Sequence, residues 1–296
     1  MEKSAQLRFL LLLTAAIAAA WHPLLLTYRL ALSKDAYTQI LLILPLSLVL
    51  IYSDWKPPLI DQRSGIVVGS VAMFFAALVA ALCTWQGTAL ADDVRLAFQM
   101  LAFVLWSIGA FTFCFGQRAA RGAIFPLCFL LWMVPLPSSV VNHVVRWLQN
   151  GSAFAATTLF STAGVPVAQD GLKLSIPGLT IEVAKECSSI RSSLMLLMTT
   201  MVLAQLLLRS PWRKLFVIAA AVPLSVAKNG LRIFTITMLG TRVDPGFLTG
   251  KLHHQGGVVF FAVALLSIFF LLWILRRPEE RSSQSGALAQ AGSSPA

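Results

Sequence analysis

Long apolar runs recur along the chain and are separated by short polar stretches. Because an α-helix needs about 20 mostly apolar residues to cross a bilayer, each run predicts a membrane-spanning helix. We expect eight spans, near residues 7–27, 37–53, 65–85, 96–115, 122–137, 188–208, 214–239 and 254–275. The fifth contains Pro126, Pro135 and Pro137, so its outer end should be kinked or broken. The first lacks a clean small-residue cleavage site and is interpreted as an uncleaved helix.

Three stretches depart from this pattern. Residues 138–162 mix polar side chains with valine and leucine, which favours an amphipathic helix on the membrane surface. Residues 164–184 alternate apolar and polar positions, with turn signals at Asp170-Gly171 and Pro177-Gly178, and predict short strands on the membrane face. Residues 278–296 are rich in Ser, Ala and Gly and predict a disordered cytoplasmic tail. The fold class is therefore an all-α integral membrane protein whose multi-pass domain covers residues 1–277.

Composition strengthens the membrane assignment. Hydrophobic residues make up 57% of the chain and charged residues 12%, against about 25% charged in soluble proteins. The net charge of +11 does not indicate a nucleic-acid partner, because the basic residues lie at the ends of apolar runs, where they anchor helices to lipid. Basic residues in the 209–214 loop and in the 276–281 segment predict that both termini are cytoplasmic.

Three polar clusters interrupt or begin the later spans. With this orientation, all three lie on the outer side of the membrane. The first cluster opens span six and comprises Lys185, Glu186, Cys187, Ser188 and Arg191. The second falls late in span seven and comprises Lys228, Asn229 and Arg232. The third opens span eight and comprises His253, His254 and Gly257.

The residue types in these clusters suit acyl-transfer chemistry. An Arg such as Arg232 within a spanning helix costs about 2.5 kcal/mol or more unless it is solvated or paired, and Lys228 lies one turn away. A helix N-terminus at Cys187 favours the thiolate, the nucleophilic form. A histidine serves as acid or base, and an arginine stabilises an oxyanion. The structural alternatives are a snorkelling arginine, an inert cysteine and interfacial histidines, and spacing alone does not place these side chains in contact.

The same residues resemble the exosortase/archaeosortase family of membrane cysteine transpeptidases. The segment GVPVAQDGLKLSIPGLTIEVAKECSSIRS is similar to the family's strand-rich approach to its catalytic Cys, here Cys187. NGLR matches the family's Asn-x-x-Arg, giving Asn229 and Arg232, and HHQGGVVFF resembles its His-x-x-x-Gly, giving His253 by counting back from Gly257, with His254 as the rival. The resemblance covers about residues 120–265. Ser189 and Val258 depart from the family's usual Gly and aromatic residue.

The resemblance implies a sorting enzyme of the cell membrane, with its active site on the outer or periplasmic face. Its partners would be secreted proteins with a C-terminal signal of a short motif, a transmembrane helix and a basic tail, together with membrane lipid. Cys187, Arg232 and His253 would be catalytic. Supporting or substrate-binding roles would fall to Glu186, Ser188, Arg191, Lys228, Asn229, His254 and Gly257.

No metal or other cofactor is expected, because the sequence has no phosphate-binding Gly-rich loop and no metal-ligand spacing. Two alternatives remain open. A transporter would also place Arg and Lys in Gly- and Pro-interrupted helices. A non-catalytic assembly protein of exopolysaccharide export would share the spans, but it would tolerate loss of Cys187, Arg232 and His253.

Overall fold

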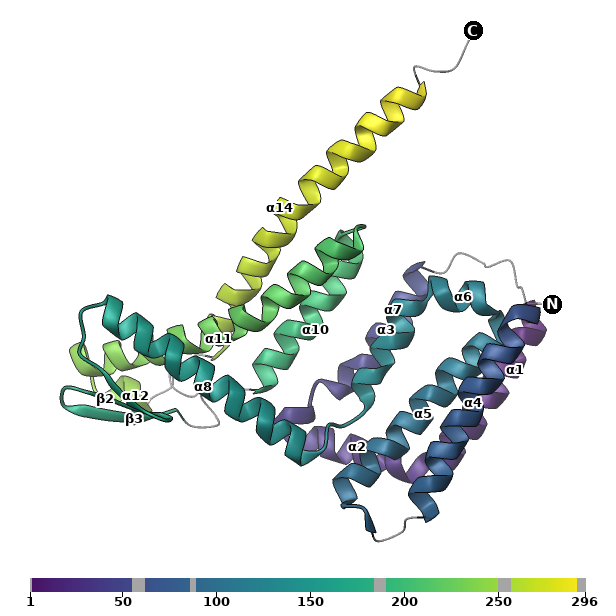
Figure 1. Cartoon of the computed structure of the whole chain (residues 1–296), viewed down its shortest axis with the longest axis horizontal. Helices are drawn as coiled ribbons and strands as arrows, with labels where there is room; N and C mark the ends of the chain where they lie inside the picture. Colours follow the sequence, from purple (N-terminus) through teal and green to yellow (C-terminus); the bar gives the residue numbers. More distant parts are fainter. Residues whose placement is uncertain (1, 55–61, 86–88, 184–189, 250–256, 292–296) are drawn as a thin grey trace. The chain divides into compact units, whose positions relative to one another are not determined.

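The chain divides into two compact units in a computed structural model that describes residues 2–54, 62–85, 89–183, 190–249 and 257–291. Unit 1 comprises Met1–Val141 and unit 2 comprises Asn142–Ala296. Figure 1 shows both units as mostly helical, with a small sheet in unit 2. Helix α8 (Ser138–Thr162) begins in unit 1 and continues into unit 2.

Unit 1 contains two long helices and several shorter ones. Its elements are α1 (Glu2–Ala19), α2 (Trp21–Ser33), η1 (Asp35–Tyr37), α3 (Ile40–Asp54), α4 (Gln62–Trp85), α5 (Asp92–Phe115), α6 (Gln117–Gly122), α7 (Ile124–Phe129) and η3 (Leu130–Met133). Near the middle of α1, Phe9 contacts Phe111 and Phe115 of α5, with ring centroids 5.8 and 5.6 Å apart. These edge-on aromatic contacts form part of the unit's core.

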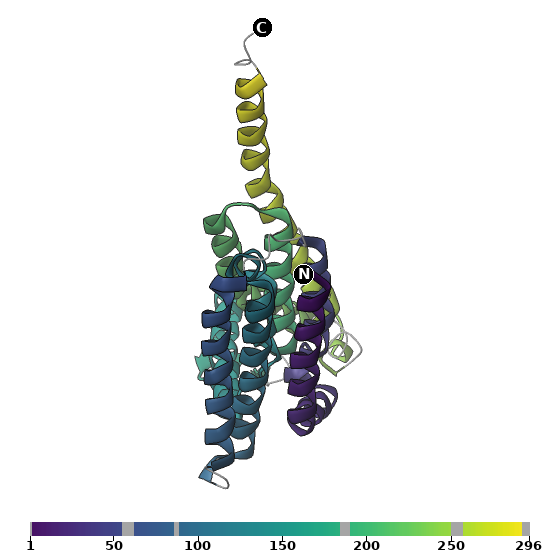
Figure 2. The same cartoon turned by 90° about the vertical axis from the view of Figure 1, so that its right-hand side faces the viewer.

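Helices α4 and α5 pack with their backbones unusually close (Figure 2). A Cβ added at Gly69 would lie 2.5 Å from the backbone N of Phe113, and one added at Gly65 would lie 2.3 Å from the carbonyl oxygen of Thr112. Small residues permit such an approach, and close packing replaces the hydrophobic effect as the force that joins helices in lipid. The two glycines therefore determine how near α4 and α5 lie.

Unit 2 is built around three packed helices, α10 (Ile190–Leu207), α11 (Pro211–Arg242) and α14 (Gly257–Ala291) (Figure 1). Their shared core is apolar and is formed by Leu196, Ala204, Leu208, Val217, Ala221, Ala264, Ile268 and Leu272. Helix α11 has 32 residues, contains Pro223 in its interior and is followed by the short helix α12 (Gly246–Thr249).

A three-stranded antiparallel sheet packs against α8 and α11. Strands β1 (Ala168–Asp170), β2 (Lys173–Ile176) and β3 (Leu179–Glu182) are adjacent in that order. Gly171 and Gly178 have φ values of 59° and 83°, which side chains with a Cβ rarely adopt. The strands and both turns predicted from the sequence are confirmed.

The amphipathic pattern of α8 is also confirmed. Its buried residues in unit 2 recur every three or four positions, at Val145, Leu148, Gln149, Ser152, Ala153, Ala156 and Phe160. His143 and Arg146 are exposed on the other side of the helix. The sheet and α8 share a core that includes Phe160, Leu174 and Val183.

The expected eight spans are not all present as uninterrupted helices. Five helices in the described part of the chain are long and apolar enough to cross a membrane, or up to seven spans if each of two bent pairs is counted as one. The first expected span bends by 73° after Ala19, where Pro23 has no N–H to donate to the Ala19 carbonyl. The expected span at 37–53 corresponds to a shorter apolar helix, Asp35–Ile51.

The break expected in the fifth span is confirmed. Ile124–Met133 and Ser138–Thr162 are bent by 99° relative to each other, and Pro135 and Pro137 lie between them. At the other end of the chain, α14 continues to Ala291, whereas the sequence predicted a disordered tail from residue 278. The segment contains Ala, Leu, Glu and Gln, which are good helix formers.

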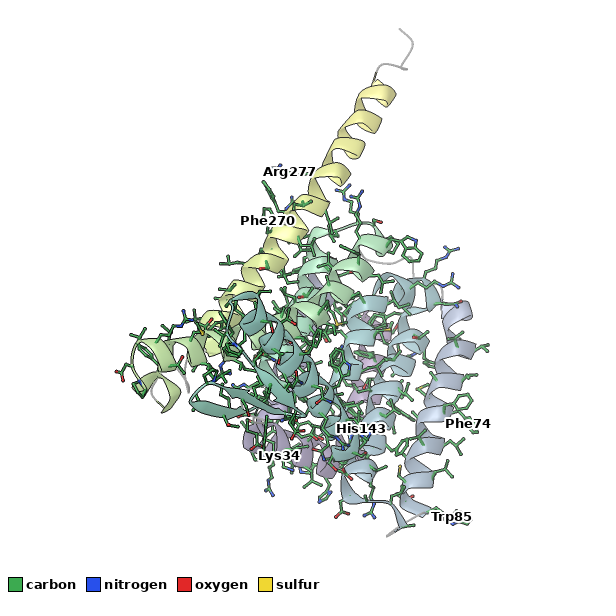
Figure 3. The ribbon with its side chains drawn as sticks, turned by 60° about the vertical axis from the view of Figure 1, so that its left-hand side comes forward. Lys34, Phe74, Trp85, His143, Phe270 and Arg277 are labelled. Carbon is green, nitrogen blue, oxygen red and sulfur yellow. The ribbon has the colours of Figure 1, made fainter. Side chains whose placement is uncertain are left out.

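Large apolar side chains cover much of the outside of the long helices. Phe74 and Trp85 of α4 are 66% and 89% exposed, and Phe270 of α14 is 61% exposed (Figure 3). In the most apolar 18-residue stretch of α4, only 17% of the residues are buried, and in that of α14 only 22% are buried. Such surfaces are stable against lipid tails and not against water. The chain is therefore a multi-pass membrane protein.

Candidate functional site

A stripe of polar side chains runs along the buried face of α11. Ser225, Lys228, Asn229 and Arg232 are all buried, with exposed fractions of 3, 6, 1 and 8%. Their spacing of i, i+3, i+4 and i+7 places them on one side of an α-helix. Two of the four carry a positive charge within a candidate membrane span, where charge is costly and usually has a function.

Hydrogen bonds join this stripe to the first turn of α10. The Lys228 ammonium donates to the Ser192 hydroxyl oxygen at 2.5 Å, and the Ser225 hydroxyl donates to Ser193 Oγ at 2.6 Å. Both serines follow Ile190, the first residue of α10, within three positions. The polar stripe therefore fixes the beginning of α10 against the middle of α11.

Arg232 also approaches the beginning of α14. A Cβ built on Gly257 would lie 3.8 Å from Arg232 Nη1, so the guanidinium lies beside the first residue of that helix. Arg232 thus lies next to the glycine of the predicted His-x-x-x-Gly motif. The arginine and the helix that follows the predicted histidine are brought together from positions 25 residues apart (257 − 232).

The sheet leads the chain towards the segment that contains Cys187. Val183, which follows β3, is 1% exposed. The Gln149 side-chain amide donates to the Val183 carbonyl at 2.9 Å. The Val183 N–H donates to the Leu172 carbonyl at 2.9 Å. These bonds fix Val183, four residues before Cys187, to α8 and to the sheet.

Several predicted site residues lie outside the described residues, namely Lys185, Glu186, Cys187, Ser188, His253 and His254. Among the described ones, Lys228, Asn229 and Arg232 share one buried helix face, and Gly257 is adjacent to Arg232. Arg191 is exposed at the start of α10. In the described ranges, no group of three or more His, Cys, Asp and Glu side chains could hold a metal ion.

Sequence reasoning missed part of this arrangement. Ser192, Ser193 and Ser225 take part in the hydrogen bonds between α10 and α11. Serine is common in membrane helices, so the sequence alone did not identify these three residues. The spacing of Ser225 from Lys228, Asn229 and Arg232 is the signal that would have identified it. Gln149 lies in the predicted amphipathic helix, and nothing in the sequence distinguishes it from the exposed polar residues there, although it is 4% exposed.

Fold and site together define an integral membrane protein with a buried cationic helix face in its C-terminal unit. The family model described as transmembrane exosortase matches residues 29–270. Because this match covers most of the chain, the protein belongs to the transmembrane exosortase family. The match also extends the similarity well before residue 120, where the motifs alone had suggested that it begins. The comparisons with curated proteins and with solved structures each gave no match.

Proposed function

We propose that this exosortase is a membrane cysteine endopeptidase or transpeptidase that cleaves a C-terminal sorting signal of secreted proteins and transfers them to a cell-surface acceptor. The observation that carries the proposal is the buried Arg232, which lies beside Gly257 at the start of α14. Membership of the exosortase family is consistent with processing of sorting signals. The proposed active site lies at the outer membrane–water interface.

In the proposed reaction, the Cys187 thiolate attacks the carbonyl carbon of the scissile peptide. The carbonyl oxygen becomes an oxyanion, and the Arg232 guanidinium donates hydrogen bonds to it. Collapse of this intermediate breaks the C–N bond and leaves a thioester on Cys187. His253 donates the proton that the leaving amine requires.

The second half of the reaction reverses these roles. His253 accepts a proton from the incoming acceptor nucleophile, which attacks the thioester carbon. Collapse of the second intermediate releases the Cys187 thiolate and leaves the secreted protein joined to the acceptor. Asn229, adjacent to Lys228 on the buried face of α11, would orient Arg232.

Replacing Cys187 by Ala or Ser in the native host tests the proposal. Cleavage of a sorting-signal protein, followed by blot, should fall by about 10⁴-fold or more, because the nucleophile and its partners act as a unit. Cys128→Ala is the matched control, since Cys128 is an exposed free cysteine in unit 1. Normal processing in the Cys187 variants would reject the cysteine mechanism. It would favour a transporter or a non-catalytic assembly protein of exopolysaccharide export.

The two neighbouring histidines are separated by the same assay. His253→Ala should abolish cleavage, whereas His254→Ala should retain it, because only His253 has the four-residue spacing from Gly257. The opposite result would move the acid–base role to His254 and leave the cysteine mechanism intact.

A further inference from the structure

One edge of the three-stranded sheet presents backbone groups without partners. In an antiparallel ladder, opposite residues alternate between pairs that exchange two hydrogen bonds and pairs that exchange none. The Val183 N–H donates to the Leu172 carbonyl, so the next pair along the ladder, Lys173 and Glu182, exchanges none, and neither does the pair of Thr180. The N–H and C=O groups of Thr180 and Glu182, here called the β3 edge, therefore point away from β2. Within the described ranges they have no hydrogen-bond partner.

The opposite edge of the sheet is better protected from pairing. In β1, which has three residues, only the backbone groups of Gln169 point away from β2. The Gln169 side chain accepts a hydrogen bond from Thr157 of α8 at 2.9 Å and donates one to the Gly171 carbonyl at 3.1 Å. Pro166, two residues before β1, has no N–H with which to extend a ladder. Short strands and prolines are the usual protection of a sheet edge, and β3 contains no proline.

The apolar face of the sheet is open beside β3. On this face, Leu174 of the central strand is 0% exposed and lies opposite Gln169 of β1 and Ile181 of β3. Gln169 ends the apolar face on one side, whereas Ile181 and Leu179 are only half-buried beside the core shared with α8. On the other face, β3 presents exposed polar side chains. A strand added to β3 would therefore bury alternate apolar side chains and expose the polar ones between them.

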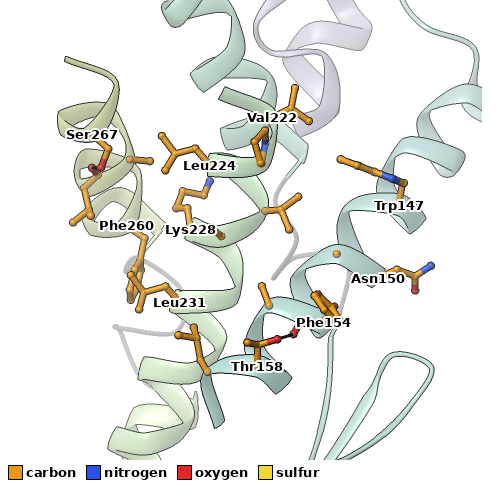
Figure 4. Close-up of a pocket in the computed structure, with 18 residues that line it drawn as sticks. Trp147, Asn150, Phe154, Thr158, Val222, Leu224, Lys228, Leu231, Phe260 and Ser267 are labelled. Atoms are coloured by element: carbon orange, nitrogen blue, oxygen red, sulfur yellow. Dashed lines mark hydrogen bonds between the residues drawn. The ribbon is translucent and has the colours of Figure 1, made fainter. Parts of the chain in front are cut away.

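The apolar groove between α8, α11 and α14 does not offer such pairing (Figure 4). Lys228 is the one charged residue among the 18 described residues that line it, and most of the others are apolar. An extended peptide in this groove would bury backbone N–H and C=O groups without partners, which is energetically costly. A sheet edge supplies those partners, so it is the better binding site for an extended chain.

The β3 edge lies a short chain length from the proposed nucleophile. Five residues along the chain separate Glu182 from Cys187 (187 − 182), and a fully extended chain spans about 3.3–3.6 Å per residue. The Cα atoms of the two residues therefore lie no more than about 18 Å apart. A peptide paired with β3 reaches the thiol within about five extended residues of its own.

We infer that the β3 edge binds, as a fourth strand, the extended segment of the substrate that precedes the scissile bond. The inference rests on the proposed function, which supplies this segment as the occupant. After the C–N bond breaks, the segment stays attached to Cys187 through the thioester, whereas the part that follows leaves as the amine. Pairing with β3 therefore holds the acyl group through both halves of the reaction. It also selects segments with apolar residues at alternate positions, which pack beside Leu179 and Ile181.

A proline at position 180 tests the edge and keeps the hydrogen-bonded pairs with β2. Thr180→Pro removes an outward N–H and places a ring on the edge, which is where a strand tolerates proline. Gln169→Pro is the matched control, because it removes the outward N–H of the opposite edge. Cleavage of an epitope-tagged sorting-signal protein in the native host is followed by blot at equal amounts of membrane-inserted chain. It should fall about tenfold or more for Thr180→Pro and stay within about twofold for Gln169→Pro.

Photocrosslinking supplies a second measurement that does not depend on a proline variant. The full chain carrying Cys187→Ala is expressed in the native host with benzoylphenylalanine in place of either Thr180 or Gln169, both of which are exposed. Adducts with the tagged sorting-signal protein should be about tenfold more abundant at position 180 than at 169. Equal labelling overturns the inference. Adducts at position 180 that join only two copies of this chain would identify edge-to-edge pairing and also overturn it.

Prolines in the substrate distinguish strand pairing from mere proximity. The scissile bond is first located by mass spectrometry of the cleaved protein. Single prolines are then placed along the nine or so residues before it, four for a strand as long as β3 and about five for the reach to Cys187. Because only every second N–H of an added strand points at its neighbour, adducts at position 180 should fall about tenfold at alternate positions. Any other pattern rejects pairing with β3.

The outcomes separate this inference from the proposed function. Because the crosslinking chain lacks the Cys187 nucleophile, specific labelling at position 180 stands even if the cysteine mechanism fails. If the wild-type chain cleaves its substrate and Thr180→Pro cleaves it equally well, the role of the β3 edge alone is rejected.

Discussion

The two compact units bury different kinds of polar side chain. In the described part of unit 1, the buried polar residues are neutral, namely Thr27, Gln39, Ser47, Ser107 and Thr112. Unit 2 also buries Lys228 and Arg232. A neutral hydroxyl is inexpensive in a membrane helix, whereas a charge is not. The buried charges of unit 2 therefore support the proposal that the active site belongs to that unit.

Their hydrogen bonds differ in the same way. In unit 1, Ser107 and Thr112 donate to Phe103 and Ile108, each within helix α5. In unit 2, Lys228 and Ser225 of α11 donate to serines of α10. Bonds within one helix satisfy a hydroxyl without fixing a second helix, while bonds between helices fix their register. Buried side chains of α11 therefore hold it against α10 in unit 2, whereas the buried hydroxyls of α5 in unit 1 are satisfied within their own helix.

The largest expected effect comes from removing the charge of Arg232. Arg232→Gln should reduce cleavage of a sorting-signal protein by about 10²- to 10³-fold, as loss of an oxyanion donor does. Arg95→Gln in unit 1 is the control, because Arg95 pairs at 3.7 Å with the fully exposed side chain of Asp92, and such surface pairs contribute about 1 kcal/mol or less. Both variants are compared by blot at equal amounts of membrane-inserted protein. Equal losses of cleavage in the two variants would contradict the assignment of the active site to unit 2.

A glycine of unit 1 should affect stability more than chemistry. Gly69→Val would press against the backbone of Phe113 and Gly109 and should destabilise the protein by about 1–3 kcal/mol or more, as overpacking does. Thermal unfolding in detergent measures the loss. Gly122→Val is the control, since a Cβ there meets nothing within 4 Å. Activity per folded molecule should stay within about twofold for both, because neither position belongs to the proposed site. A much larger fall in the activity of folded Gly69→Val would place unit 1 in the mechanism.

The smallest effect is expected at the support of the sheet. Gln149→Leu removes the amide that donates to the Val183 carbonyl and should cost about 1 kcal/mol of stability. Cleavage should slow by about tenfold or less, because Val183 precedes Cys187 by four residues and is also held by Leu172. Asn142→Leu is the control, since Asn142 is an exposed amide on the same helix. Unfolding temperature and initial cleavage rate are measured together. Unchanged values for Gln149→Leu would show that the bond does not position the chain.

Much of the local structure could be predicted from the sequence. The turns at Gly171 and Gly178, the buried stripe of α8 and the break before Ser138 each follow from residue types with strong local preferences. The number of spans could not be predicted as well. Hydropathy counts apolar residues and is insensitive to the bend at Pro23, which divides one apolar run into two helices.

The candidate site was predictable in its charges and not in its contacts. Arg232 and Lys228 stand out because charge is rare in an apolar run. The bonds to Ser192 and Ser193 depend on which face of α10 packs against α11, and spacing along one helix carries no information about its neighbour. The approach of Arg232 to Gly257 has the same origin, since it results from the packing of α11 against α14. Cys187 and His253 lie outside the described residues, so their meeting with Arg232 stays a prediction.

Pro223 interrupts the backbone hydrogen bonding in the interior of α11. Proline has no N–H, so the helix lacks the hydrogen bond that residue 223 would otherwise donate to the Ala219 carbonyl. Before this weak point, Val217 and Ala221 are clamped in the three-helix core; after it come Lys228 and Arg232. Both cations lie on the same side of this break, so one uninterrupted stretch of helix carries them and keeps their mutual spacing.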